Sequence, residues 1–111
     1  MSDIVNVPAV VHADFVVIHS GDSMTCLKIY DGDIVYVREQ SRVTDGQIAV
    51  VAAGDELLIG KIQNHPDCFW LIPGNPMYKS YVFNRDDSSV RILGQAVASL
   101  TFFLQEDTES P

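Results

Sequence analysis

The stretch "QIAVVAAGDELLIGKI", residues 47–62, contains two runs of apolar and β-branched residues on either side of a Gly-Asp pair. β-branched side chains favour strands, and glycine adopts the positive backbone angles that tight hairpin turns require. The stretch therefore predicts two strands joined in a hairpin across Ala53-Gly54-Asp55.

The same pattern of apolar runs separated by turn residues continues on both sides of this hairpin. Further strand-like runs are "DFVVIHS", "DIVYVRE", "CFWLIP" and "SSVRILGQAVASLTFF". Turn pairs such as Asp31-Gly32 separate them, and this spacing predicts an all-β domain. One short helical turn is expected at "SMTCLKIY", with Ser23 as its N-cap. Gly94 predicts a bulge or bend that lets the last strand serve two sheets.

Composition limits the classes of protein that this chain can represent. Its 111 residues are 47% hydrophobic and 20% charged, which is typical of one globular domain. A net charge of −8, from 15 acidic against 7 basic residues, opposes direct binding to nucleic acid. No apolar run is long enough to cross a membrane, so we expect no membrane anchor. Cys26 and Cys68 lack a CxxC partner, which favours reduced thiols and a cytoplasmic location.

Several polar residues could suggest chemistry but have simpler interpretations. His12, His19 and His65 show no metal-ligand spacing, and we expect neither a metal nor another cofactor. Asp31 and Asp33 are expected to satisfy the backbone of their own turn.

Cys26 is expected to be a small buried residue. The aromatic side chains of Trp70, Tyr78 and Tyr81 are expected mostly in the core, because aromatic residues bury large areas.

Ser23 is a candidate nucleophile, because it lies on a glycine-led turn, "SGDSM". A serine hydroxyl is a weak nucleophile that needs a neighbouring base and donors for the oxyanion. His19 precedes the turn, but no Ser-His-acid set with a defensible spacing is present. A Ser-Lys pair would instead require an inward-facing lysine on a neighbouring strand.

Six segments together carry a family resemblance: "ADFVVIHSGDSM", "DGDIVYV", "DGQIAVV", "ELLIGKI", "WLIPGNPMY" and "VRILGQAVASL". In order and spacing they resemble the self-cleaving C-terminal domain of LexA, the UmuD proteins and lambda-type phage repressors, which are S24-type Ser-Lys peptidases. The resemblance covers residues 13–104. It implies a strongly bent, barrel-like β-sheet and a homodimer. In the repressors of this family, self-cleavage separates a DNA-binding domain from the dimerising domain.

The resemblance also assigns roles to individual residues. Ser23 matches the nucleophile, while Asp22, Met24 and the turn backbone match the residues that shape the oxyanion pocket. Gly60 stands where the family has its general-base lysine. Lys61 comes one residue later and should point to the opposite face of the strand, unless a β-bulge turns it inward. We therefore expect impaired or lost self-cleavage.

The resemblance further implies a domain layout and partners. Residues 1–12 are expected to form an arm or linker, 13–104 the domain, and 105–111 a flexible acidic tail. Phe102 and Phe103 are candidates for the dimer interface. An N-terminal helix-turn-helix domain, and a RecA-type co-protease or an antirepressor, are the further partners that the family suggests.

Two other functions remain open at this point. The chain could be an active Ser-Lys peptidase that uses Lys61 through a bulge. It could also be a UmuD-like accessory protein of an error-prone polymerase.

Overall fold

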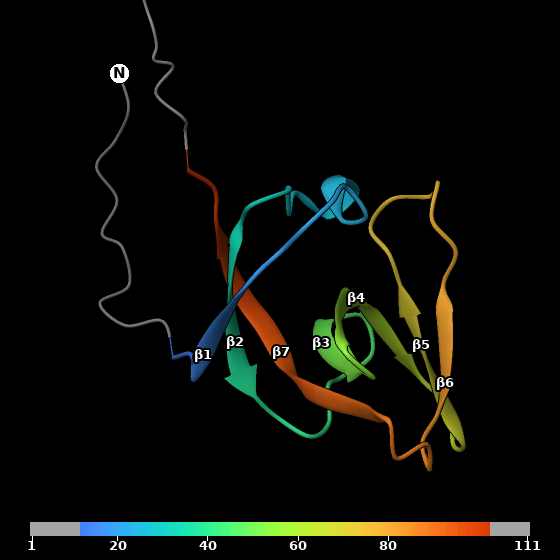
Figure 1. The fold of residues 1–111 in the computed structure, drawn as a ribbon. Coiled ribbons are helices and arrows are strands. Elements are labelled where there is room, and N and C mark those ends of the chain that lie inside the picture. The colour runs from blue at the N-terminus through green and yellow to red at the C-terminus, as the bar shows by residue number, and fades with distance from the viewer. Residues whose placement is uncertain (1–11, 103–111) are drawn as a thin grey trace, which may run out of the picture.

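The computed structural model describes residues 12–102, which form one curled antiparallel sheet of seven strands (Figure 1). The order across the sheet is β1-β2-β7-β3-β4-β5-β6. The elements are β1 (Phe15–Ile18), the 3-10 helix η1 (Thr25–Leu27), β2 (Ile34–Glu39), β3 (Ile48–Ala53), β4 (Glu56–Asn64), β5 (Cys68–Ile72), β6 (Tyr81–Asn84) and β7 (Val90–Leu100). The predicted all-β, strongly bent sheet with one short helical turn is confirmed. No helix in this part of the chain is long and apolar enough to cross a membrane.

Strand β3 lies at the middle of the curl and is buried on both faces. Val50 belongs to one hydrophobic cluster, while its neighbours Ala49 and Val51 belong to the other. Successive side chains of a strand point to opposite faces, so a sheet that curls around β3 buries all three. This explains why "IAVVAA" is a continuous apolar run instead of an alternating one.

The hairpin predicted around residue 54 is present. Ala53 pairs with Glu56, so β3 and β4 are joined by the two residues Gly54 and Asp55. Gly54 has a φ of 61°, a conformation that glycine adopts without the cost borne by other residues.

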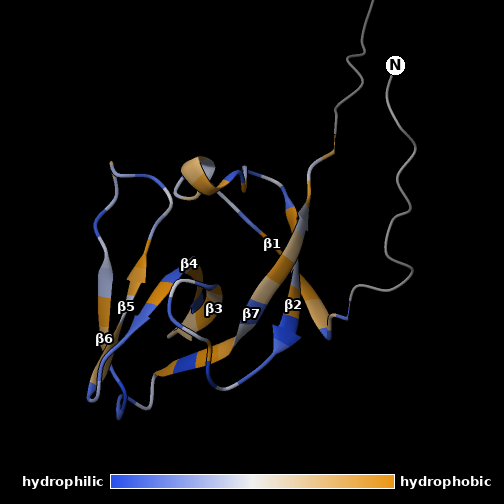
Figure 2. Cartoon of the chain, turned by 180° about the vertical axis from the view of Figure 1, so that it is seen from behind, coloured by the Kyte–Doolittle hydropathy of each residue, from blue (hydrophilic) through white to orange (hydrophobic). Residues whose placement is uncertain are grey.

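Strand β7 produces much of the curl because its pairing slips on both sides. Its partners skip Leu93 on the β3 side and Val97 on the β2 side, and each slip is a bulge-type irregularity. The bulge or bend predicted at Gly94 is therefore present, and a Cβ on Gly94 would collide with the carbonyl oxygen of Arg38. The expectation that β7 serves two sheets is wrong, because these bulges bend one continuous sheet. Figure 2 shows the alternation of polar and apolar residues along the first part of β7.

The turn that carries Ser23 lies at one end of the curl. Figure 1 shows η1 at this end, beside the loop that joins β5 to β6. The backbone hydrogen bond from Cys26 N to Gly74 O, 2.7 Å long, links η1 to this loop. Segments that are far apart in the sequence therefore build the surroundings of the serine.

Candidate active site

The serine turn is held to the acidic turn that follows it. Gly21 has a φ of 90°, and its N–H donates to Asp31 Oδ1 at 2.7 Å. Gly32 N donates to His19 O at 2.7 Å, and Tyr30 N donates to Asp33 Oδ2 at 2.8 Å. Asp31 thus ties two turns together, while Asp33 satisfies its own turn as predicted.

The side chain of Met24 connects the serine turn to the loop after β5. This side chain is fully buried, and its Sδ atom accepts a hydrogen bond from Gly74 N at 3.3 Å. Met24 is also the N-cap of η1 and makes no side-chain cap bond, so the expectation that Ser23 caps the helical turn is wrong. The Ser23 hydroxyl is therefore not engaged as a helix cap.

Asp22 connects the serine turn to the loop between β5 and β6. The Tyr78 hydroxyl donates a short hydrogen bond to Asp22 Oδ1, and Asn75 Nδ2 donates to Asp22 O at 2.9 Å. The bond to Asp22, reinforced by the negative charge of that carboxylate, raises the pKa of Tyr78. Ionised Tyr78 would lose its proton donor and meet a like charge, so the link favours a neutral tyrosine.

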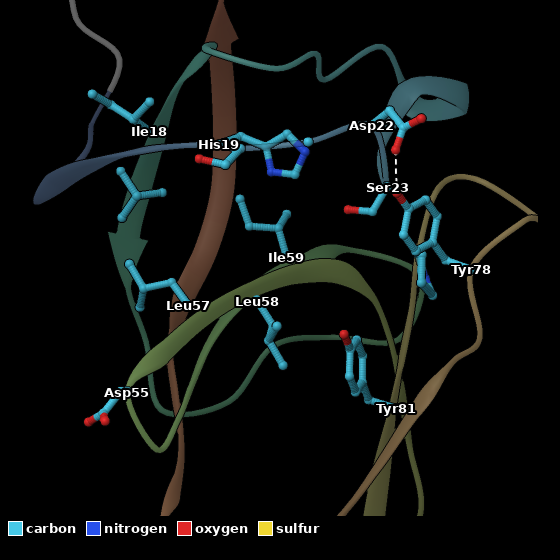
Figure 3. A pocket seen from close by; sticks show the side chains of 14 residues that line it. Ile18, His19, Asp22, Ser23, Asp55, Leu57, Leu58, Ile59, Tyr78 and Tyr81 are labelled. Atoms are coloured by element: carbon cyan, nitrogen blue, oxygen red, sulfur yellow. Dashed lines mark hydrogen bonds between the residues drawn. The ribbon is translucent and has the colours of Figure 1, made fainter.

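Ser23 lines a cleft of about 500 Å³ (Figure 3). One wall consists of the end of β1 and the serine turn, and the facing wall contains Leu57, Leu58 and Ile59 of β4. Tyr78 and Tyr81 line the cleft from the loop after β5 and the start of β6. The expectation that Tyr78, Tyr81 and Trp70 are core residues is wrong, because 46%, 44% and 40% of their surfaces are exposed.

Position 60 faces Leu71 and Ile72 of β5 and is closely surrounded. Gly60 is buried, and a Cβ there would lie 2.9 Å from both Leu71 Cγ and Ile72 O. The chain has packed around a glycine at this position. A longer side chain could enter only if Leu71 or the Ile72 backbone moved.

Lys61 lies outside the lining of the cleft that holds Ser23. It is exposed, and β4 pairs with β3 without a register shift from Lys61 to Glu56. The bulge that would turn Lys61 inward is therefore absent from this pairing. The other two lysines of the chain, Lys28 and Lys79, are also exposed and outside the cleft lining.

His19 is a feature of the cleft that the sequence did not single out as functional. Only 5% of its surface is exposed, and its Nε2 atom is buried without a hydrogen-bond partner among the described residues. Burial lowers the pKa of His19, against the opposing effect of the nearby Asp31 and Asp33. The imidazole is therefore neutral at neutral pH.

The remaining predicted residues fall outside the cleft. Cys26 is exposed instead of buried, because η1 is too short to cover it. Within residues 12–102, no three His, Cys, Asp or Glu side chains gather into a group that could hold a metal ion. Phe102 is 60% exposed just beyond β7, and Phe103 lies outside the described residues. The arm before residue 12 and the tail from 105 also lie outside them.

Comparison with known proteins identifies the family of this fold and cleft. The sequence model of the family described as "Peptidase S24-like" matches residues 4–97. The chain belongs to this family. The predicted resemblance is thereby confirmed, and it extends over most of the described domain.

The similar curated proteins are LexA repressors. The chain is 36% identical over 80 residues to a LexA repressor of Bifidobacterium adolescentis, which covers 72% of this chain and 30% of that protein. It is 32% identical over 92 residues to a LexA repressor of Pseudomonas chlororaphis, covering 81% of this chain and 46% of that protein. The chain thus spans less than half the length of these S24-like relatives.

Two features of this S24-like cleft were missed by the sequence reasoning for different reasons. His19 follows the alternation of β1, in which Phe15 and Val17 face the core, so its inward orientation could have been deduced. The link from Tyr78 to Asp22 joins residues 56 positions apart, and no local pattern indicates it.

Proposed function

We propose that this chain is the regulatory, dimer-forming C-terminal part of a LexA-like repressor, with impaired Ser-Lys self-cleavage. The proposal rests on family membership together with one observation. Ser23 lines the cleft, yet none of the three lysines of the chain does so.

The missing lysine removes the proton acceptor that the family's chemistry requires. Serine attack needs a base that takes the hydroxyl proton, and a general base typically contributes about 10²–10⁴-fold to the rate. Gly60 supplies no side chain at the matching position, and Lys61 is exposed and does not line the cleft. We infer that lysine-driven cleavage is slower by a factor of this order.

The charge of the chain supports a regulatory role separate from DNA contact. Fifteen acidic against seven basic residues give a net charge of −8, which disfavours contact with phosphates. We therefore assign DNA binding to a separate N-terminal part, as the family resemblance suggests.

Dimerisation is proposed through the end of β7. Leu100 and Phe102 are 43% and 60% exposed at this end, where β7 pairs with β2, which is one strand in from the β1 edge of the sheet. Exposed apolar side chains of this kind, close to a sheet edge, favour contact between protein subunits.

The lysine part of the proposal is tested by labelling Ser23 with a fluorophosphonate at about pH 9, followed by intact-mass measurement. Ser23→Ala gives the background, and Lys79→Ala is a matched control for the loss of an exposed lysine. We expect Lys61→Ala to label at the same rate as the wild-type chain. A rate for Lys61→Ala that falls to the Ser23→Ala background would show that Lys61 is a working base.

A further inference from the structure

The buried imidazole of His19 carries an unexplained nitrogen. Only 5% of the surface of His19 is exposed, and Nε2 has no hydrogen-bond partner among the described residues. A buried polar atom without a partner costs about 1–3 kcal/mol, so such atoms in folded proteins call for an explanation. His19 and Ser23 both line the cleft, four residues apart across one turn.

The protonation state of this nitrogen follows from its surroundings. Burial lowers the pKa of His19, while Asp31, Asp33 and the backbone of Gly21 act in the opposite direction. A neutral imidazole carries a lone pair on one of its two nitrogens, and Nε2 is the buried nitrogen without a partner. Burial keeps the ring neutral despite the charges of Asp31 and Asp33.

The geometry points to His19 as the general base for Ser23, a Ser-His pair that takes the place of the missing lysine. This inference rests on the proposed function of the same cleft. Figure 3 shows His19 and Ser23 along the same wall, with Ile59 and the other β4 residues across the cleft. The two side chains are not hydrogen-bonded to each other. Rotation about the Cα–Cβ bond of Ser23 redirects Oγ, and catalytic hydrogen bonds often tighten only around a substrate.

Among the ionisable side chains that line the cleft, His19 is the one best placed to accept the proton of Ser23. Asp22 is occupied by the Tyr78 hydroxyl, whose own pKa is raised. Asp55 lies in the β3–β4 turn and Tyr81 at the start of β6, both on the side of the cleft opposite the serine turn (Figure 3). His19 is the neighbour of Ser23 with a free lone pair at neutral pH.

The reaction is an acyl transfer to Ser23. As Oγ attacks the carbonyl carbon of an ester or peptide, its proton moves to Nε2 of His19 and a tetrahedral intermediate forms. Collapse of the intermediate breaks the bond to the alcohol or amine, which leaves with the proton from the imidazolium. Water then hydrolyses the acyl-serine by the same route, with His19 again accepting and returning the proton.

The cleft wall indicates the class of acyl group. Ile18 and Leu57 are 69% and 53% exposed at the cleft, and Leu58 and Ile59 extend the same apolar surface. Burial of exposed apolar area drives binding at roughly 25 cal/mol per Å². We therefore assign the site to acyl groups with apolar side chains, in peptides or esters.

The test is the rate of Ser23 labelling by an alkyl fluorophosphonate from pH 5 to pH 10, again measured by intact mass. The serine oxygen bonds to phosphorus, fluoride leaves, and His19 takes the proton. The pKa of His19 lies below the ordinary histidine value of 6.5. The labelling rate should therefore increase as the pH is raised towards 6.5 and stay constant at higher pH. His19→Gln should reduce the plateau by about 100-fold, while His65→Gln, at an exposed histidine, should not change it.

The result has separate meanings for the two proposals. No labelling above the Ser23→Ala background, or a rate that keeps rising to pH 10, would overturn the role of His19. Loss of labelling in Lys61→Ala would instead overturn the proposed loss of lysine chemistry. If His19→Gln does not fold, the pH profile of the wild-type chain alone decides between a histidine and a lysine base.

Discussion

A side chain at position 60 would have to fit between Leu71 and the carbonyl oxygen of Ile72, each 2.9 Å from the place of its Cβ. Most glycines inside strands are weak points, because alanine there is favoured by roughly 0.5–1 kcal/mol. Here the close approach of a backbone oxygen reverses that preference. Gly60 is therefore a packing requirement of β4 and β5.

Gly60→Ala should lower the free energy of unfolding by about 1–2 kcal/mol, the lower part of the range for overpacked sites. Chemical denaturation monitored by circular dichroism measures this change. Gly94→Ala is the companion variant, and it should be more destabilising because its Cβ meets the Arg38 carbonyl even more closely. A Gly60→Ala protein more stable than wild type would contradict the packing described here.

His19 should make stability depend on pH. Its pKa is lowered in the folded chain, chiefly by burial, from an ordinary value of 6.5. Below pH 6.5 the unfolded chain therefore binds a proton more readily than the folded chain, and stability falls as the pH falls. Denaturation midpoints between pH 7 and pH 5 should show this decline, and His19→Gln should flatten it. The exposed His65→Gln should keep the slope, and an identical slope in all three proteins would contradict the account.

At the scale of elements, hydrogen bonds hold the serine turn at the point where three segments meet. The turn after β1 is tied to the acidic turn by Asp31, while Met24 and Asp22 tie it to the loop after β5. The hairpin and the all-β class could be predicted, because β-branched runs and turn residues are local signals. The exposure of Tyr78 and Cys26 could not, because it depends on how distant segments pack.

Met24→Ala should destabilise the domain by about 2–5 kcal/mol, the range for truncating a fully buried methionine. It also removes the sulfur acceptor of Gly74 N, so the loop after β5 should loosen. Thermal unfolding measures the loss, and hydrogen exchange at the Gly74 amide locates it. Met77→Ala, at an 87% exposed methionine, should have nearly no effect. Equal effects of the two variants would show that Met24 does not anchor the turn.

On the scale of the whole molecule, one curled sheet exposes two different surfaces. The cleft opens between β1 and β4, and the apolar end of β7 lies beside β2. The sequence predicted the S24-like family, because several motifs agree in order and spacing. It could not predict that His19 Nε2 is buried without a hydrogen-bond partner, because this depends on how the whole molecule packs.

The proposed dimer gives a prediction at this scale. Phe102→Asp should convert a dimer to a monomer in sedimentation velocity, since it places a charge in an apolar contact. Val82→Asp is the matched control, because Val82 is 54% exposed on β6 at the opposite edge of the sheet. Dissociation by Val82→Asp but not by Phe102→Asp would move the interface to the other edge.

The most direct test of the central claim compares Ser23 labelling by a fluorophosphonate in Gly60→Lys and Gly60→Gln between neutral pH and about pH 10. Both variants introduce a long side chain into the same tight space, and only the lysine supplies a base. If Gly60 occupies the position of the lost lysine, labelling of Gly60→Lys should keep rising towards the alkaline end, whereas labelling of Gly60→Gln should stay flat. Equal rates in the two folded variants would contradict the claim.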